Sequence, residues 1–463
     1  MNSYTATGLA DLKALGQSAA GSIQRIKLAA GLTEFPAELY SFCQTLEILD
    51  LSDNQLTALP DDFWRFRRLS RLFLTNNHFR AIPAVLAQCP ALLMLSFKGN
   101  QLKEFASGVL PENLQWLILT DNQLRTLPDD FGRYQKLKKL ALAGNQLSAL
   151  PDSMQQCRQL GLVRLSLNCF EQFPDWLFTL PQLAWLALGA NPACVVPENA
   201  DIKLPLLPSQ AFLCLEILGE GASGVIYRAQ FIPSDVASIA ETGTVDAPTL
   251  PAGTEVALKR FKGWITSDGC PKDELHNYLN AGAHPNLIPV LARIRDIELP
   301  ALAMALIPKE FQSLGRPPSF ETITRDTFHP ELTLTASAVL KLAQQLASVV
   351  TQLHQRQIMH GDLYAHNVLS NPQRQLYLGD FGAATALDGL PLWQQQQAKA
   401  LEIRAFGYFL ADVLVLLPAG QRASELVSAL QQLCQQCLLP EPALRPVAAS
   451  VYAQLQQLDK LQD

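Results

Sequence analysis

The sequence predicts two architectures in one chain, an amino-terminal α/β solenoid and a carboxy-terminal bilobal α+β domain. Up to about Pro197 an apolar pattern recurs in steps of 23 residues, with a single step of 22. After Pro197 the period stops, and the rest of the chain carries non-repeating motifs of a second kind. We therefore expect an amino-terminal cap over residues 1–22, a repeat domain over 23–199, a linker over 200–210 and a second domain over 211–463.

Each repeat combines regularly spaced leucines with one asparagine, as in LQWLILTDNQL from Leu114 to Leu124. The asparagines are Asn54, Asn77, Asn100, Asn122, Asn145, Asn168 and Asn191. Gly31 lies one step before the first of them, so a degenerate eighth repeat opens the array. The pattern L-x-x-L-x-L-x-x-N-x-L is that of leucine-rich repeats, whose short strands bury their leucines only by stacking on neighbouring repeats. Buried amides need hydrogen-bond partners, so we expect the asparagines to bond the turn backbone as scaffold residues.

The variable strand positions of the repeats predict a concave face rich in aromatic and basic side chains. They are Arg25, Ile48, Arg71, Met94, Trp116, Lys139, Leu162 and Trp185, with Phe73, Ile118 and Arg164 two residues further along their strands. Such side chains are typical of interface anchors, so we interpret the strip as a site for a protein partner. Two alternatives stay open: the strip packs on the chain's own second half, or it is an ordinary sheet surface.

Charge and apolar patterning exclude several classes of partner. The net charge of -6, without a Lys/Arg-rich run, argues against nucleic acid and anionic lipid. The longest apolar stretches, PALAMALIP and YFLADVLVLLP, are too short to span a membrane, and the first residues lack a secretory signal. We expect a cytoplasmic protein with reduced cysteines, in which Cys434 and Cys437 lie on the inner face of a helix and bind no zinc.

The second domain begins with a glycine-rich loop. Gly219, Gly221 and Gly224 form G-x-G-x-x-G in LGEGASGVIY, between two expected strands. Small residues let the backbone approach phosphates, and a following strand in place of a helix disfavours a dinucleotide-binding fold. A polar, Pro/Gly-rich insertion of roughly 25 residues then separates the second strand from the third.

Further motifs follow in a fixed order. They are EVALKRF with Lys259, a helix-like segment with Glu274, LAMALIP with Met304, HGDLYAHN over 360–367, and LYLGDFGAA with Asp380. In order and spacing these motifs resemble those of protein kinases. The resemblance implies an amino-terminal lobe over about 211–309 and a carboxy-terminal lobe over about 310–463, with ATP and Mg²⁺ bound as in that family.

The resemblance also implies roles for the polar residues. Lys259 would hold the α- and β-phosphates and form an ion pair with Glu274, for which Asp273 is the alternative. Asp362 would orient the acceptor hydroxyl, while Asn367 and Asp380 would hold Mg²⁺. The nucleotide-binding residues that the resemblance implies are Leu218, Gly219, Gly221, Gly224, Ile226, Ala257, Lys259, Met304, Ala305, Ile307 and Leu369.

Several positions depart from the family pattern. Gly361 replaces the Arg that usually receives an activation-segment phosphate, and Tyr364 replaces a catalytic-loop Lys. No A-P-E motif is present, and Thr385 is the only hydroxyl residue between Asp380 and Glu402.

Neighbouring residues are expected to compensate for some of these changes. We expect Glu402 to hold the catalytic-loop backbone, and Arg445, in a P-x-x-R element, lacks its usual glutamate. His360 is expected in the packing and backbone network, whereas for His366 both a charged role and a structural hydrogen bond stay open.

The whole chain is similar to leucine-rich repeat protein kinase-like proteins of bacteria. This resemblance implies a Ser/Thr-type kinase with a recognition solenoid. Two alternatives remain open: a nucleotide-binding scaffold with little turnover, and a small-molecule phosphotransferase, since H-G-D-L also occurs in enzymes of that class.

Overall fold

The computed structural model describes residues 2–19, 21–194, 204–221, 224–232, 250–266, 268–295, 297–299 and 301–461. The chain forms two compact units, Met1–Leu183 with Asn191–Ala193, and Ala184–Ala190 with Cys194–Asp463. Residues 233–249, most of the expected insertion, and residues 200–203, the first of the expected linker, lie outside the described residues.

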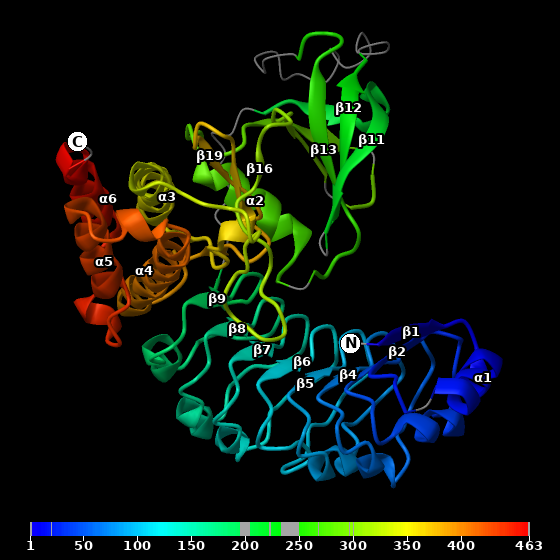
Figure 1. Cartoon of the computed structure of the whole chain (residues 1–463). Helices are drawn as coiled ribbons and strands as arrows, with labels where there is room; N and C mark the ends of the chain where they lie inside the picture. Colours follow the sequence, from blue (N-terminus) through cyan, green and yellow to red (C-terminus); the bar gives the residue numbers. More distant parts are fainter. Residues whose placement is uncertain are drawn as a thin grey trace. The chain divides into compact units, whose positions relative to one another are not determined.

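The first unit is a stack of short parallel strands, each paired with the strand of the next repeat (Figure 1). Its main elements are β1 (Ser3–Ala6), α1 (Leu9–Ala19), β2 (Arg25–Leu28), β3 (Ile48–Asp50), β4 (Arg71–Phe73), β5 (Met94–Ser96), β6 (Trp116–Ile118), β7 (Lys139–Ala141) and β8 (Leu162–Arg164). The return segments are 3-10 turns: η1 (Ala37–Phe42), η2 (Phe63–Arg65), η3 (Ala84–Gln88), η4 (Phe131–Arg133), η5 (Asp152–Gln156) and η6 (Asp175–Thr179). The register places Leu49 beside Leu72, and both are fully buried. The predicted solenoid is confirmed.

The repeat asparagines form a ladder of backbone contacts. Asn122 shows the pattern: its Nδ2 donates to the carbonyls of Phe97 and Leu119 at 2.9 and 3.0 Å, and its Oδ1 accepts from the Leu102 N–H at 2.9 Å. The side chain thus satisfies backbone groups of its own repeat and of the preceding one, which strand pairing leaves without partners. The expected scaffold role of the asparagines is confirmed.

The second unit combines a six-stranded sheet with a helical part. The sheet has the order β10-β14-β15-β13-β12-β11. Figure 1 shows its strands β11, β12 and β13 side by side. The elements up to its last strand are β9 (Trp185–Ala187), β10 (Leu206–Pro208), η7 (Ser209–Ala211), β11 (Phe212–Glu220), β12 (Gly224–Phe231), β13 (Glu255–Phe261), α2 (Pro271–Ala281), β14 (Val290–Arg295) and β15 (Ala301–Ala305).

The helical part follows β15 and includes two small sheets, β16-β18-β19 and β17-β20. Its elements are β16 (Gln312–Ser313), α3 (Ala336–Gln355), β17 (Ile358–Met359), η9 (Ala365–Asn367), β18 (Val368–Ser370), β19 (Leu376–Leu378), β20 (Thr385–Ala386), α4 (Leu392–Val415), η10 (Ala419–Gln421), α5 (Glu425–Cys437), η11 (Pro442–Leu444), α6 (Ala448–Gln457) and η12 (Leu458–Leu461). A mixed sheet followed by a helical part is the architecture that the sequence predicts for the second domain.

Local signals explain where α2 begins and ends. The Cys270 side chain accepts from the Asp273 N–H, and Pro271 occupies the first helical turn, where its missing donor costs nothing. Two acidic residues, Asp273 and Glu274, lie in the same first turn, which favours negative charge. Gly282 ends the helix at a φ of +70°. These signals place Glu274 one turn from the helix start, on a buried position.

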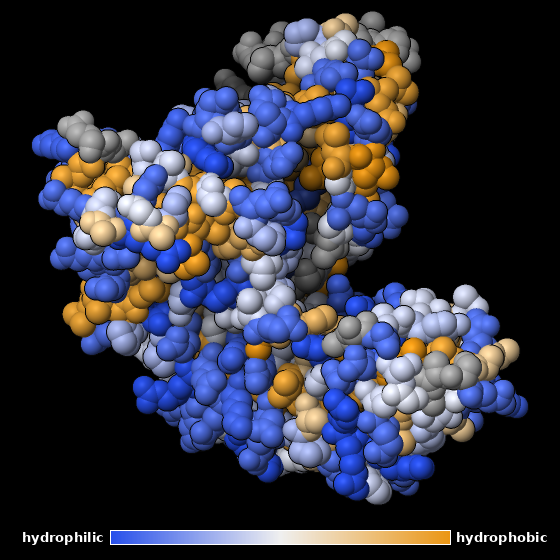
Figure 2. Space-filling model, in the orientation of Figure 1, coloured by the Kyte–Doolittle hydropathy of each residue, from blue (hydrophilic) through white to orange (hydrophobic). Residues whose placement is uncertain are grey.

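The β11 edge of the six-stranded sheet is apolar at its surface, as Figure 2 shows. Leu213, Leu215 and Ile217 are 50%, 45% and 59% exposed, and they alternate along the strand.

The two closely spaced cysteines of α5, Cys434 and Cys437, are buried. Burial raises the pKa of the Cys437 thiol to about 12. Within the ranges described, no helix has both the length and the apolar character needed to cross a bilayer.

Candidate active site

A cavity of about 260 Å³ in the second unit gathers most of the residues that the sequence singles out. Its lining includes Gly219, Gly221, Gly224, Ile226, Lys259, Glu274, Met304, Asn367, Leu369 and Asp380. Sequence reasoning did not identify Glu220, Tyr278, Ile288, Leu302 or Gly379 as part of this lining. The cavity therefore lies between the glycine-rich hairpin of β11 and β12, strand β13, helix α2 and the loops around β18 and β19.

Lys259 and Glu274 form a buried ion pair at this cavity. Lys259 lies on β13 and Glu274 on α2, and their side chains are 11% and 4% exposed. Burial lowers the pKa of Lys259, but the carboxylates of Glu274 and Asp380 outweigh this effect and raise it overall. The ammonium is therefore charged at neutral pH. Asp273 lies elsewhere, where its side chain accepts from the backbone of Ala190 and contacts Cys270.

The catalytic loop places Asp362 and Asn367 in direct contact. Asn367 Nδ2 donates to the Asp362 carboxylate at 2.8 Å and to the Asp362 carbonyl at 2.9 Å. These two bonds fix the carboxylate and leave the amide oxygen of Asn367 as the atom suited to a metal. Asp362 itself is half-buried and does not line the cavity wall.

Asp380 follows β19 and lies in a strained backbone conformation. Its φ is +54°, a value that residues other than glycine rarely adopt, and its Oδ1 accepts from the Gly382 N–H at 3.2 Å. The strained residue lines the cavity beside Lys259, whose pKa it helps to raise. Such outliers cluster at functional sites because the surrounding structure must hold them.

Glu402 of α4 holds the backbone of the catalytic loop, as expected. Its Oε1 accepts from the Gly361 N–H at 2.9 Å, and its Oε2 lies 2.8 Å from His354 Nε2. His360 is fully buried, with Nδ1 accepting from the Asp362 N–H and Nε2 2.9 Å from the Gly379 carbonyl. The expected packing and backbone role of His360 is therefore confirmed.

The segment after Asp380 is short and closed. β20 pairs with β17, and α4 begins at Leu392. Thr385 is fully buried, and its hydroxyl accepts from the Leu188 N–H at 3.0 Å. The sole hydroxyl residue of the segment is thus inaccessible to a kinase without local opening.

Arg445, which lacks its usual carboxylate partner, donates instead to three backbone carbonyls. These are the carbonyls of Leu439, Ala400 and Pro440, at 2.8, 2.8 and 3.0 Å.

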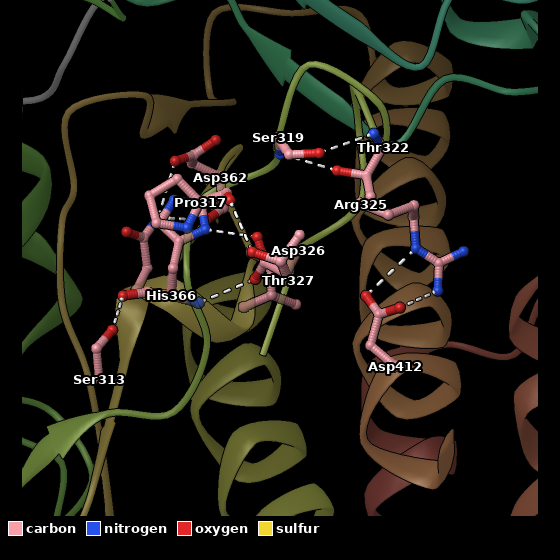
Figure 3. A network of polar contacts seen from close by, with 12 residues as sticks. Ser313, Pro317, Ser319, Thr322, Arg325, Asp326, Thr327, Asp362, His366 and Asp412 are labelled. Carbon is pink, nitrogen blue, oxygen red and sulfur yellow. Dashed lines mark hydrogen bonds and ion pairs between the residues drawn. The ribbon is translucent and has the colours of Figure 1, made fainter. Parts of the chain in front are cut away.

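His366 is held by a buried aspartate that sequence reasoning missed. One oxygen of Asp326 lies 2.7 Å from His366 Nδ1, and the other accepts from the His366 N–H at 2.9 Å (Figure 3). Burial lowers the pKa of His366, but the bond and charge of Asp326, together with Asp362 and Asp380, outweigh it and raise the pKa. Asp326 sits in an irregular loop before α3, so periodicity offered no signal for it.

The same loop is tied to α4 by the residue before Asp326. Arg325 forms an ion pair with Asp412, with Nε 3.2 Å from Oδ2 (Figure 3). Its guanidinium lies 4.4 Å from the centre of the Tyr408 ring. Ser313 Oγ donates to the His366 carbonyl at 2.6 Å. The residues next to the catalytic loop are therefore fixed from β16, from this loop and from α4.

Some predicted nucleotide-binding residues do not line the cavity. Leu218 is 45% exposed on β11, whereas Ala257 is buried opposite Met304 in the sheet register. Ala305 donates its N–H to the Pro289 carbonyl at 2.8 Å, and Ile307 is half-buried after the end of β15. The cavity thus takes in the phosphate and metal side of the predicted site more completely than the purine side.

Comparison with known proteins identifies both parts of the chain. Residues 213–405 match the family model described as protein tyrosine and serine/threonine kinase, and residues 30–79 match the leucine rich repeat model. Serine/threonine-protein kinase PITSLRE of Drosophila melanogaster is 30% identical over 181 residues, which cover 38% of this chain. Leucine-rich repeat and calponin homology domain-containing protein 1 of Mus musculus is 31% identical over 115 residues, 24% of this chain.

The chain spans 16% of the length of each of these two relatives. A solved leucine-rich repeat protein of Leptospira interrogans has 27% sequence identity and a TM-score of 0.36, covering 43% of this chain and 57% of that one. The kinase match contains Lys259, Asp362 and Asp380 and ends inside α4. The two family matches show that the chain carries a leucine-rich repeat domain and a protein kinase domain.

Proposed function

We propose that the chain is an ATP-dependent protein kinase of the Ser/Thr type, whose repeat domain recognises a protein. One observation carries the proposal: a single cavity holds the buried Lys259–Glu274 pair, the Asn367 amide and the Asp380 carboxylate, with Asp362 bonded to that amide. Phosphoryl transfer asks mainly for alignment and neutralisation of charge, and these groups would provide both.

Each residue has a defined part in the proposed reaction. The charged Lys259 would bind phosphate oxygens of ATP, and Glu274 keeps it directed into the cavity. Asp362, fixed by Asn367, would orient the hydroxyl of the acceptor. Mg²⁺, when bound, would neutralise phosphate charge, and the Asn367 amide oxygen and the Asp380 carboxylate fit the oxygen ligands that it prefers.

The departures from the family pattern support a slow enzyme with an unusual acceptor site. Tyr364 supplies no positive charge to the transferred phosphate, and removing one such contact costs about 2–4 kcal/mol in comparable cases. The ten or so residues before α4 are paired with β17 or packed, which leaves little platform for a peptide. Recognition of a protein acceptor would then rest on the repeats. A nucleotide-binding scaffold and a small-molecule phosphotransferase are the alternatives.

The test measures ATP turnover of the wild type, Asp362→Asn, Lys259→Met and a control, Lys103→Met, which changes an exposed lysine of the repeat array. We expect the first two variants to lose about 100-fold or more in turnover, because each removes a transition-state contact, and the control to match the wild type. Mass spectrometry after incubation with Mg-ATP would locate any transferred phosphate.

Each outcome selects one function. Equal background rates for all four proteins would overturn the kinase proposal in favour of the scaffold. Turnover stimulated by small hydroxylated acceptors, with no phosphate on any protein, would replace it with the small-molecule phosphotransferase. Membership of the bacterial leucine-rich repeat kinase-like proteins and a cytoplasmic location are further parts of this proposal, and both rest on the sequence motifs and patterning alone.

A further inference from the structure

The segment Ala184–Ala190 belongs to the second unit, although the sequence places it in the last repeat. Its Trp185 is 2% exposed, and the indole N–H donates to the carbonyl of Leu363 at 3.1 Å. Leu363 directly follows Asp362. The indole therefore bonds the backbone of the catalytic loop one residue from the proposed catalytic carboxylate.

The same indole stacks on the tyrosine that replaces the catalytic-loop lysine. The rings of Trp185 and Tyr364 lie 4.4 Å apart and are inclined by 5°, and the Tyr364 ring in turn lies 4.9 Å from that of His366. Stacked aromatic pairs of this kind contribute beyond their buried area. A flexible lysine at position 364 would lose this contact, so the tyrosine suits a loop that is packed in place.

The helix α4 contributes a second ring that stacks on the indole. Tyr408 lies 5.3 Å from Trp185 at an interplanar angle of 16°. Tyr408 is itself held by the Arg325 guanidinium, 4.4 Å from the centre of its ring, and Arg325 is anchored on Asp412. Trp185 thus contacts a fixed ring of α4 and, through Tyr364, the catalytic loop.

The backbone of the segment explains why position 361 carries glycine. Gly361 has a φ of +73°, and a Cβ there would lie 2.6 Å from the carbonyl oxygens of both Leu186 and Ala383. Leu188 reaches the segment after Asp380 through its bond to Thr385. An arginine at position 361 would therefore collide with the chain that occupies this space.

We propose that Trp185 is a positioning residue, which holds the catalytic loop in its working conformation without any phosphate on the segment after Asp380. In related kinases an arginine before the catalytic aspartate receives such a phosphate and so couples it to loop order. Here the indole bond to Leu363 and the stack on Tyr364 provide that order permanently. The inference rests on the proposed kinase function.

The test compares full-length wild type, Trp185→Ala, Trp185→Phe and the control Trp64→Ala, which changes a tryptophan 37% exposed in the repeat array. We expect Trp185→Ala to lose about 100-fold in kcat, the scale of a small misplacement of catalytic groups. The KM for ATP and the affinity for Mg-ATP should change less than threefold, because Trp185 does not line the cavity. Treatment of the wild type with a protein phosphatase should leave kcat unchanged.

Trp185→Phe separates positioning from a general loss of structure. It keeps a ring but lacks the N–H donor to Leu363, so its kcat should lie between those of the wild type and Trp185→Ala. If Trp185→Ala does not fold, the kcat of Trp185→Phe tests the inference in its place, and a wild-type kcat in Trp185→Phe overturns it. If it folds, wild-type kcat in Trp185→Ala overturns it. A phosphatase-treated wild type that loses its activity also overturns it.

Failure of the kinase proposal has a different signature. A wild type no faster than Asp362→Asn overturns the kinase function and, with it, the positioning role. An active wild type whose kcat is unaffected by Trp185→Ala overturns the positioning role alone.

Discussion

Gly361 shows how one residue records the packing around the catalytic loop. Its φ of +73° lies in the left-handed region, and a Cβ at this position would lie 2.6 Å from each of two carbonyl oxygens. For a residue with a side chain, that backbone conformation alone costs roughly 1–2 kcal/mol. The local space at position 361 therefore does not admit the arginine of the family pattern.

Gly361→Ala should lower the free energy of unfolding of the second unit by roughly 2 kcal/mol or more, since strain and steric overlap add. Its control is Gly420→Ala, where a Cβ meets no atom within 4 Å. Thermal unfolding of both variants measures the difference. Equal melting temperatures would contradict the close approach to Leu186 and Ala383.

Glu274 and Asp273 are neighbours on α2 with different surroundings. Glu274 pairs with Lys259 and is 4% exposed, whereas Asp273 contacts the helix start at Cys270. The sequence left both open as partners of the lysine. The helix phase decides between them, since successive residues of a helix point about 100° apart.

Glu274→Gln should lower turnover about 100-fold, because Lys259 loses the charge that, in the proposed reaction, would hold it at the phosphates. Asp273→Asn should leave the affinity for Mg-ATP and kcat within a factor of three. Calorimetric titration with Mg-ATP and steady-state kinetics check the pair. A larger kinetic effect from Asp273→Asn than from Glu274→Gln would contradict the assignment.

At the scale of elements, the loop before α3 takes part in holding the catalytic loop. Asp326 is 6% exposed and bonds both the ring and the backbone N–H of His366. Arg325 anchors the same loop on α4 through Asp412. An irregular loop with two charged anchors thus acts as a fixed support for η9, which carries Asn367.

Asp326→Asn should lower kcat about tenfold and the free energy of unfolding by about 1–3 kcal/mol, because a bond to a charged group is weakened at a buried position. Asp388→Asn, at an exposed carboxylate in the segment before α4, is the matched control. Urea unfolding and initial rates provide the two readouts. If Asp326→Asn matches its control in both, this loop does not support the catalytic site.

At the scale of the whole molecule, the boundary between the units does not follow the repeat pattern. Ala184–Ala190 continues the leucine-rich period but belongs to the second unit through Trp185 and Leu188. Sequence periodicity reports how a segment is built, not which side chains it finally contacts. The kinase domain as a compact unit therefore begins earlier than its family motifs suggest.

A fragment that begins at Leu204 lacks Ala184–Ala190 and should show the low kcat of full-length Trp185→Ala, with nucleotide affinity retained. The reason is that Tyr364 and Tyr408 lose the indole that stacks on them. Steady-state kinetics on the fragment and on the two full-length proteins provide the comparison. A fragment with wild-type kcat would show that the segment is dispensable for catalysis.

The sequence by itself determined the repeat solenoid and the identity of the second domain. Both are recognised from the spacing of residues along the chain. The repeat asparagines recur at a near-constant step, and the kinase motifs occur in a fixed order that chance does not produce. It also indicated Glu402 as the residue that holds the catalytic-loop backbone, a contact that the structure contains.

Only the tertiary structure decided what fills the places of the missing family residues. Trp185, 178 positions before Leu363, and Asp326, 40 before His366, reach the catalytic loop from irregular or repeat segments. Such contacts leave no periodic trace in the chain, because they depend on where the folded backbone brings distant side chains together. The physical reason is that spacing encodes local geometry, while burial and close approach are properties of the packed molecule.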